Sequence, residues 1–203
     1  MKKICFATSL FIGATCLASC GGVSIDEAGW KKAFSPENFT NCWIIYSETT
    51  NERLQGGYTQ VRFDGSKSYY SLYTLSDEKD ESGDYIHEYV SEIFYEVDSG
   101  SKEWEYDLNI ATGEYTKKEA EVNLAKDFLN KMCDHFKDEY ANFTLDGDYY
   151  EKMLGASERE VVRFFEGKLN IIQWSDRTNS QKRLAYSYSF GFGKTTITIP
   201  SVK

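Results

Sequence analysis

Short alternating stretches rich in tyrosine and phenylalanine, separated by tight-turn signals, run through most of this chain. In residues 58–63, apolar or β-branched side chains alternate with polar ones, which is the two-residue period of a β-strand. Asp64-Gly65 follows and is a strong hairpin signal, and residues 69–75 are expected to form the second strand of this hairpin. The chain has 15 Tyr and 13 Phe but only 2 Pro, and aromatic residues favour the pleated surface of strands. These features predict a sheet protein.

Further strands are predicted before and after that hairpin. Asp146-Gly147 marks another hairpin turn, and Glu166-Gly167-Lys168 marks a third. Residues 85–97 are ambiguous, because their apolar positions also fit a helical stripe, but their Tyr, Ile, Val and Phe content favours a strand. The strands expected from these patterns are 42–46, 58–63, 69–75, 85–97, 104–108, 143–153, 161–165, 169–174, 185–190 and 195–199.

Two helices are expected among these strands. Asp26 can cap a short helix over residues 26–34, and Ser35-Pro36 ends it. Thr116 and Glu119 form a capping-box pattern, which predicts a helix over residues 117–141 that packs across the sheet. The apolar residues of this second helix recur at helical spacing: Ala125, Phe128, Leu129, Met132, Cys133, Phe136 and Tyr140.

The segments that follow the two predicted helices show a weak internal sequence similarity. Asn38-Phe39-Thr40 follows the first, and Asn142-Phe143-Thr144 follows the second. After each come an Asp-Gly turn and a Tyr-Tyr pair. This similarity indicates either two related halves, each a helix followed by a meander, or a coincidence of common turn residues.

The first twenty residues form a leader. Met1-Lys2-Lys3 is positively charged, residues 4–18 are uncharged and mostly apolar, and Leu17-Ala18-Ser19-Cys20 ends the run. About 15 apolar residues are too few to span a bilayer comfortably, so the pattern is that of a secretory signal. Leu, two small residues and Cys resemble the lipobox of bacterial lipoproteins. The resemblance implies cleavage before Cys20 and acylation of that residue, with residues 1–19 as signal peptide, 20–25 as tether and 26–203 as a single domain.

Charge limits the partners of this domain. Removal of Lys2 and Lys3 with the leader changes the formal net charge from −9 to −11. An acidic domain is a poor match for nucleic acid and for electrostatic docking on anionic lipid. We therefore expect no nucleic-acid partner, and attachment to the cell membrane or outer membrane, outside the cytoplasm, through the lipid on Cys20.

The cysteines and histidines suggest little chemistry. After the leader and Cys20, only Cys42 and Cys133 remain, and they form either a disulfide or two buried thiols. His87 and His135 are not at metal-ligand spacing, so no metal or other cofactor is expected. No G-x-S-x-G motif occurs, and nothing singles out a carboxylate pair for glycoside hydrolysis, although that alternative stays open. The sequence favours a protein that is not an enzyme.

The order of elements and the ending Phe190-Gly-Phe-Gly-Lys-Thr-Thr-Ile-Thr-Ile-Pro200 resemble those of LolA/LppX-like half-barrel lipoproteins. The resemblance implies an α+β fold, with a curved antiparallel sheet packed around one long amphipathic helix. It also implies a groove between sheet and helix that binds or carries an apolar, lipid-like ligand. Phe128, Met132 and Phe136 are the expected ligand-binding residues. The alternative is a surface or accessory lipoprotein with a filled core that works through a protein partner.

Overall fold

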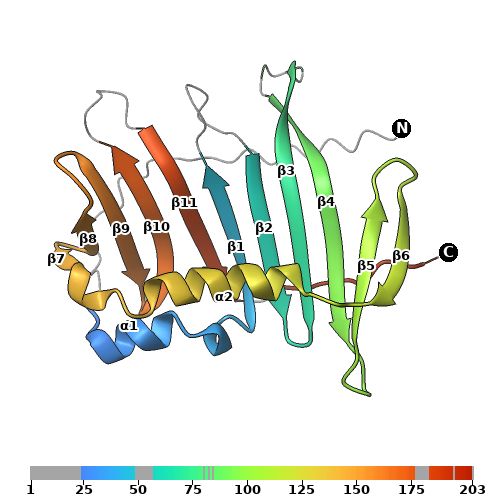
Figure 1. Cartoon of the computed structure of the whole chain (residues 1–203), viewed down its shortest axis with the longest axis horizontal. Helices are drawn as coiled ribbons and strands as arrows, with labels where there is room; N and C mark the ends of the chain where they lie inside the picture. The colour runs from blue at the N-terminus through green and yellow to red at the C-terminus, as the bar shows by residue number, and fades with distance from the viewer. Residues whose placement is uncertain are drawn as a thin grey trace.

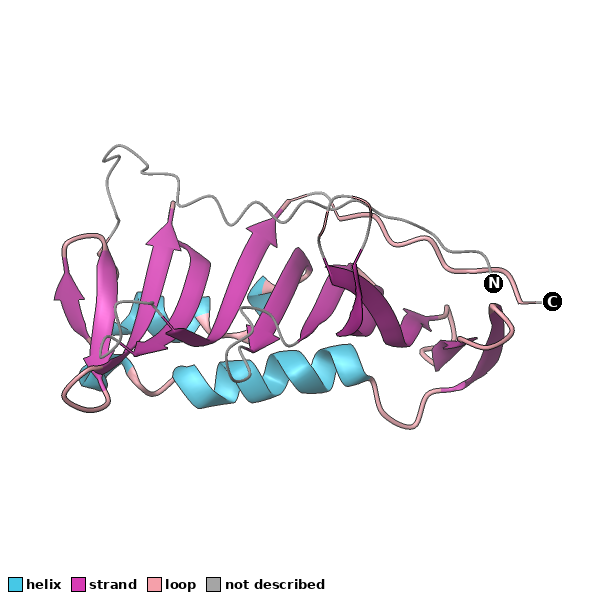
Figure 2. Ribbon diagram, turned by 90° about the horizontal axis from the view of Figure 1, so that it is seen from above, coloured by secondary structure: helices cyan, strands magenta, loops and turns pink. Residues whose placement is uncertain are grey.

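An open, curved antiparallel sheet dominates the computed structural model, which describes residues 24–48, 57–79, 81, 83, 85–176, 183–193 and 195–202 (Figures 1 and 2). A sheet-dominated α+β fold was predicted from the sequence and is confirmed. The strands in the described residues are β1 (Asn41–Glu48), β2 (Gly57–Asp64), β3 (Lys67–Lys79), β4 (Tyr85–Val97), β5 (Glu103–Asn109), β6 (Glu114–Glu119), β7 (Thr144–Asp146), β8 (Tyr149–Met153), β9 (Glu158–Phe165), β10 (Lys168–Asp176) and β11 (Arg183–Phe192).

The sheet is built from two meanders that meet in its middle. Its strand order is β6-β5-β4-β3-β2-β1-β11-β10-β9-β8-β7, so neighbours in the sheet are neighbours in the chain except at one pair. That pair is β1 with β11, in which Cys42 lies opposite Phe192 and Tyr46 opposite Tyr188. Residues 85–97 form β4, as the aromatic and β-branched content predicted.

A short helix precedes the first meander. Helix α1 (Glu27–Ala33) begins after Asp26, whose Oδ1 accepts a hydrogen bond from the Gly29 N–H at 2.8 Å. This confirms the predicted cap. A 3₁₀ turn, η1 (Pro36–Asn38), then leads into β1. A second 3₁₀ turn, η2 (Tyr140–Asn142), leads into β7 in the same way.

Helix α2 (Leu124–Phe136) has 13 residues and is much shorter than the predicted helix over 117–141. The capping-box residues instead belong to β6, where Glu119 lies opposite Trp104 and Lys117 opposite Tyr106. The Lys117 ammonium lies 4.5 Å from the centre of the Trp104 ring, a cation–π contact that favours the strand. The predicted start and length of the helix were therefore wrong. Of its apolar stripe from Ala125 to Phe136, every member but the half-buried Phe128 is buried as expected.

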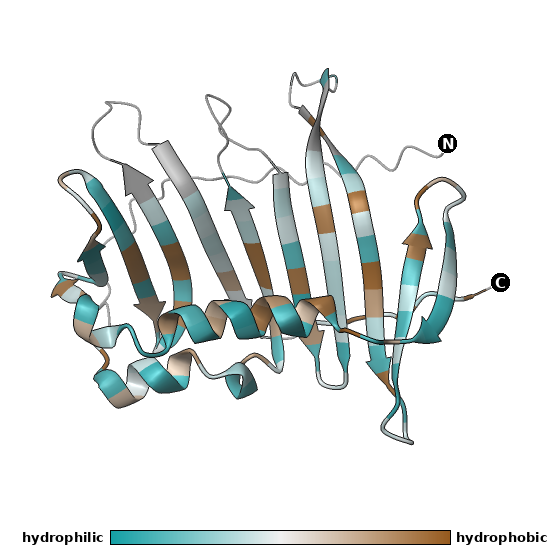
Figure 3. Cartoon of the chain, in the orientation of Figure 1, coloured by the Kyte–Doolittle hydropathy of each residue, from teal (hydrophilic) through white to brown (hydrophobic). Residues whose placement is uncertain are grey.

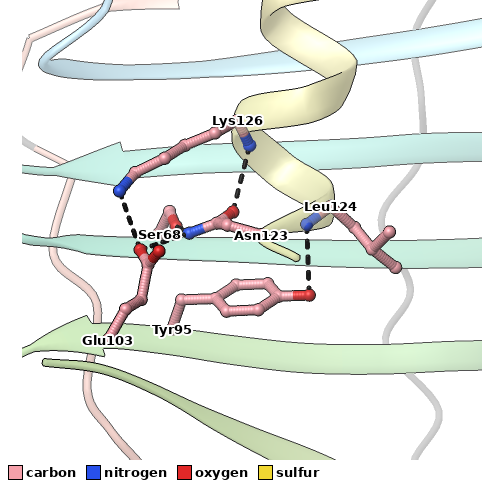
Figure 4. Close-up of polar contacts among 6 residues, drawn as sticks. All are labelled: Ser68, Tyr95, Glu103, Asn123, Leu124 and Lys126. Carbon is pink, nitrogen blue, oxygen red and sulfur yellow. Dashed lines mark hydrogen bonds and ion pairs between the residues drawn. The ribbon is translucent and has the colours of Figure 1, made fainter. Parts of the chain in front are cut away.

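A polar network fixes the N-terminus of α2 to the sheet (Figure 4). Asn123 caps the helix, because its Oδ1 accepts from the Lys126 N–H at 3.0 Å. Its Nδ2 donates to Ser68 Oγ at 2.9 Å and to Glu103 Oε1 at 2.7 Å. The Leu124 N–H donates to the Tyr95 hydroxyl at 3.2 Å. One side chain thus joins α2 to β3 and β5.

Replacing Asn123 with alanine is expected to lower the free energy of unfolding by about 1–2 kcal/mol, because the cap and the bonds to buried Ser68 and part-buried Glu103 are lost together. Urea denaturation followed by circular dichroism measures the loss. Lys126→Met is the matched control, since it removes only the half-exposed ion pair with Glu103, which is worth less than about 1 kcal/mol. Equal losses in the two variants would contradict this role of Asn123.

The core lies between the sheet and the helices. Figure 3 shows hydrophobic residues on the central strands close to α2 in this view. Many side chains on the helix face of the sheet are fully buried, for example Val61 of β2, Val162 of β9 and Ile172 of β10. The core cluster also includes Trp30 of α1 and Phe34, the residue that follows this helix. The space between sheet and helices is therefore occupied by side chains along most of α2.

The last described segment, residues 195–202, lies on the side of the sheet away from the helices (Figure 2). The Thr195 N–H donates to Asn41 Oδ1 at 2.7 Å, and the Ile197 N–H donates to Asp64 Oδ2 at 3.0 Å. Ile197 is buried. A strand was predicted over 195–199, but the segment has no strand assignment because its N–H groups bond side chains at the ends of β1 and β2 instead of a neighbouring strand.

Candidate binding site

Four aromatic side chains gather where α2 faces the middle of the sheet. They are Tyr46 of β1, Phe128 of α2, and Tyr186 and Tyr188 of β11, all half-buried. The Phe128 ring centre lies 6.0 Å from that of Tyr46 and 6.1 Å from that of Tyr188. Tyr46 and Tyr188, opposite each other in the register of β1 and β11, are 4.6 Å apart. We call these four residues the aromatic cluster.

A hollow of about 360 Å³ adjoins the aromatic cluster and shares Tyr46 with it. Binding pockets for small molecules begin at about 300 Å³ and are mostly apolar. Gly57 forms part of the wall, and a side chain there would meet the Tyr73 carbonyl oxygen at 2.5 Å. The remaining lining comes from the adjoining parts of β1 to β4: Tyr46, Glu48, Tyr58, Thr59, Leu72, Tyr73, Thr74 and Val90.

Carboxylates accept hydrogen bonds from two hydroxyl groups of the aromatic cluster. The Tyr46 hydroxyl donates to Glu48, and the Tyr186 hydroxyl donates to Glu160, which is buried. Burial raises the pKa of Tyr46 and of Tyr186, and raises that of Tyr188 to about 12. The tyrosines of the cluster are therefore uncharged at neutral pH, and they present ring faces suited to an apolar ligand.

A lysine lies beside the buried carboxylate. Lys152 Nζ is 2.5 Å from Glu139 Oε2 and 3.9 Å from Glu160 Oε2. The hydrogen bond from Lys152 lowers the pKa of Glu139. The carboxylates around the cluster thus have partners within the protein, which leaves the rings and the hollow as the features open to a ligand.

The structure separates the three ligand-binding residues predicted on α2. Phe128 is half-buried and belongs to the aromatic cluster. Met132 and Phe136 are 2% and 1% exposed. The Phe136 ring stacks on Phe34 at 5.3 Å. Phe128 alone of the three combines core packing with partial exposure and with a ring contact to Tyr46, which lines the hollow.

The predicted lipidation site, Cys20, lies outside the described residues. The chain is described from Ser24 onward, and Ile25 is held by Tyr150 and Tyr140 through its backbone. Among the helices of the described part of the chain, none has the length and apolar content needed to cross a bilayer.

Cys42 and Cys133 are both free and buried in the core. This is the second of the two arrangements that the sequence left open. The Cys42 thiol donates to the Phe39 carbonyl oxygen at 3.5 Å. Burial raises the pKa of each thiol to about 12, so both stay protonated and unreactive in the folded protein.

These thiols predict a loss of stability at alkaline pH. The unfolded chain releases each thiol proton near pH 8.5, whereas the folded chain keeps it to about pH 12. The stabilising effect is complete below about pH 8 and falls as the pH rises, by about 1–2 kcal/mol per thiol between pH 8 and pH 10. Urea denaturation at both pH values measures it. The Cys42→Ala/Cys133→Ala variant should lose less stability over this range, and an unchanged pH dependence would refute the assignment.

Metal-binding clusters are absent from the part of the chain that the structure describes. His135 is exposed, with its ring 4.6 Å from that of Phe136. The side chain of His87 lies outside the described side chains, as do Asp80 and Asp84 of the acidic stretch 76–84.

Sequence reasoning did not select Tyr46, Tyr186 or Tyr188 as site residues. The alternation in 185–190 did indicate that Tyr186 and Tyr188 share one face of a strand. Their proximity to Tyr46 depends on the pairing of β1 with β11, which are far apart in the chain, and no local pattern shows that pairing.

Comparison of the chain with protein-family models, with curated proteins and with solved structures finds no significant match. Any functional inference therefore rests on the residues and geometry described above.

Proposed function

We propose that the protein is a bacterial lipoprotein, anchored outside the cytoplasm in the cell membrane or outer membrane through acylated Cys20, that binds an apolar, lipid-like ligand without catalysis. The observation that supports this proposal is the half-buried aromatic cluster beside a hollow of about 360 Å³. The ligand lies between the sheet and α2, in the arrangement of the half-barrel lipoproteins. Phe128 contacts it directly, while Met132 and Phe136 form the packed base beneath.

The charges around the cluster support an uncharged ligand portion there. Tyr46 and Tyr186 donate to Glu48 and Glu160, so the acidic side chains are engaged internally. An apolar body that displaces water from the rings gains hydrophobic free energy at roughly 25 cal/mol per Å² of buried apolar area. No step of this proposal requires a metal or other cofactor.

The direct test uses a version of the chain that begins at residue 22, since all described contacts lie within residues 24–202. Native mass spectrometry, followed by extraction with organic solvent, identifies any molecule that copurifies. Titration with cis-parinaric acid, a fluorescent fatty acid, then gives a Kd. A retained apolar molecule or saturable binding of the probe is the expected result.

Replacing Phe128 with serine is expected to raise the Kd for cis-parinaric acid about tenfold or more, because an aromatic contact of the order of 1.5–3 kcal/mol is lost. Phe165→Ser is the matched control. Phe165 is 55% exposed on β9 and follows buried Phe164, so its side chain lies on the opposite face of the sheet. Circular dichroism confirms that both variants fold. Identical Kd values for Phe128→Ser and the unaltered protein would refute this placement.

A second candidate is a surface or accessory lipoprotein that binds a protein partner and no small ligand. The burial of Met132 and Phe136 favours it, because the space between α2 and the sheet is already packed there. A clean mass without a copurified molecule, together with no uptake of cis-parinaric acid, would favour this candidate over the ligand-binding one.

A further inference from the structure

The described chain begins at one end of the sheet, where its backbone is held tightly. The Ile25 N–H donates to the Tyr150 hydroxyl at 2.7 Å, and that hydroxyl donates to the Ile25 carbonyl oxygen at 2.5 Å. Tyr140 donates to the same carbonyl at 3.5 Å. Tyr150 belongs to β8, which is next to the sheet edge formed by β7. Residues 20–25, the expected tether, therefore join the folded domain beside this edge. Strands β7 and β6 form the two ends of the sheet (Figure 1).

The reach of the tether is short compared with the width of the sheet. Ile25 is five residue steps along the chain from Cys20, and at no more than about 3.6 Å per step they span at most about 18 Å. Nine strand spacings separate β8 from β6 in the strand order, which is about 40 Å at roughly 4.8 Å each. A lipid on Cys20 thus holds the β7–β8 edge near the bilayer, whereas β6 is able to lie far from it.

Exposed apolar side chains are distributed along that same edge. Leu145 of β7 is 46% exposed, Met153 of β8 is 53% exposed, Leu154 in the following turn is 43% exposed, and Phe165 of β9 is 55% exposed. Leu145 lies opposite buried Tyr150, on the face of the sheet that packs against the helices, whereas Met153, opposite Arg159, and Phe165 lie on the other face. The edge thus presents apolar side chains on both faces, over a length of about 20 Å along the strands. Such residues are suited to the boundary between head groups and acyl chains.

Two arginines at this edge pair with neighbouring carboxylates. Arg163 contacts Asp148 at 3.4 Å, and Arg159 contacts Glu151 at 3.1 Å. Both arginines also lie about 6 Å from the ring of Tyr149. Arginine–carboxylate pairs and a tyrosine next to exposed apolar residues are compatible with the interfacial region of a bilayer. Contact of this edge with a bilayer therefore depends on the burial of apolar side chains and on the lipid anchor, not on attraction to anionic lipid.

From these observations, we propose that the edge formed by β7 to β9, with Leu145, Met153, Leu154 and Phe165, rests on the phospholipid surface and sets the sheet edge-on to the membrane. This inference depends on the proposed acylation of Cys20. The other meander, β1 to β6, then projects away from the bilayer, and the aromatic cluster lies between the two, about midway along the sheet.

The test uses the mature, lipid-anchored protein in vesicles of phosphatidylethanolamine and phosphatidylglycerol. Leu145→Cys and Phe165→Cys are labelled with bimane, and Ile110→Cys is the matched control. Ile110 is 51% exposed and follows β5 near the opposite edge. The native cysteines of the folded domain, Cys42 and Cys133, are buried and do not compete for the label. Brominated lipids in the same vesicles quench only fluorophores that contact the bilayer.

Labels at 145 and 165 are expected to lose at least half of their fluorescence in brominated vesicles, and the label at 110 is expected to lose none. Equal quenching at all three positions, or quenching at 110 alone, would overturn the proposal. A concentration-dependent change at 145 and 165 without bromine quenching would assign the edge to a second copy of the chain instead. Flotation of the vesicles is measured first. If the mature protein does not float with them, the anchor itself is refuted, whereas flotation without quenching refutes the edge contact alone.

Discussion

Replacing Trp30 with alanine is expected to lower the free energy of unfolding by about 3–5 kcal/mol, the range for a large aromatic side chain removed from a core. Trp30 is fully buried, and its Nε1 donates to the Phe136 carbonyl oxygen at 2.8 Å. Its ring centre lies within 6 Å of five other aromatic rings, those of Phe34, Tyr140, Phe143, Tyr150 and Phe164. The substitution therefore removes contacts of α1 with α2 and with strands β8 and β9 at the same time.

Thermal denaturation followed by circular dichroism measures the effect, with an expected fall in Tm of roughly 6–20 °C for a domain of this size. Trp43→Ala is the matched control. Trp43 is 36% exposed on β1, and its ring covers Gly191 on the neighbouring strand. We expect a loss of about 1 kcal/mol or less there. If Trp30→Ala and Trp43→Ala shift Tm equally, Trp30 does not join the helices to the sheet as described.

Replacing Cys20 with serine is expected to abolish incorporation of radiolabelled palmitate into the protein completely. A serine has no thiol to carry the diacylglycerol, and the two described cysteines, Cys42 and Cys133, are buried. In the proposed lipoprotein, the substitution also removes the anchor, to which each buried methylene group contributes about 0.8 kcal/mol. Labelled cells are lysed, and the protein is isolated by an affinity tag at its C-terminus and counted.

Cys16→Ser is the control for that experiment, because it changes a cysteine four residues earlier and leaves Leu17-Ala18-Ser19-Cys20 unchanged. It should keep the full palmitate signal. Label retained in Cys20→Ser would exclude Cys20 as the lipidation site, and with it the proposed anchor. Loss of label in both variants would point to a failure of export of the whole leader.

Local chemistry explains which elements could be predicted from the sequence. Asp64-Gly65 and Asp146-Gly147 both lie in hairpin turns, with Gly65 and Gly147 in the left-handed region that glycine adopts easily. Asp26 caps α1 because its side chain reaches the Gly29 N–H three residues later. In each case the residues that decide the structure are adjacent in the chain, so a short window contains the whole signal.

The start of α2 shows where a local signal misleads. Thr116 and Glu119 match a capping box, yet both lie in β6, because pairing with β5 and the contact of Lys117 with Trp104 stabilise an edge strand. The true cap is Asn123, whose partners Ser68 and Glu103 are 55 and 20 residues away. The aromatic cluster depends still more on distant residues, because it requires β1 to pair with β11.

The junction of β1 and β11 has a consequence for the order in which the protein assembles. Within each meander, neighbouring strands are close in sequence, and contacts of that kind form quickly. The junction instead joins residues such as Cys42 and Phe192, which are 150 positions apart, and closing so long a loop is slow. Tyr46 and Tyr188 lie on the two sides of this junction. The candidate site is therefore expected to appear only at the last step of folding, so that uptake of an apolar probe during refolding would report completion of the sheet.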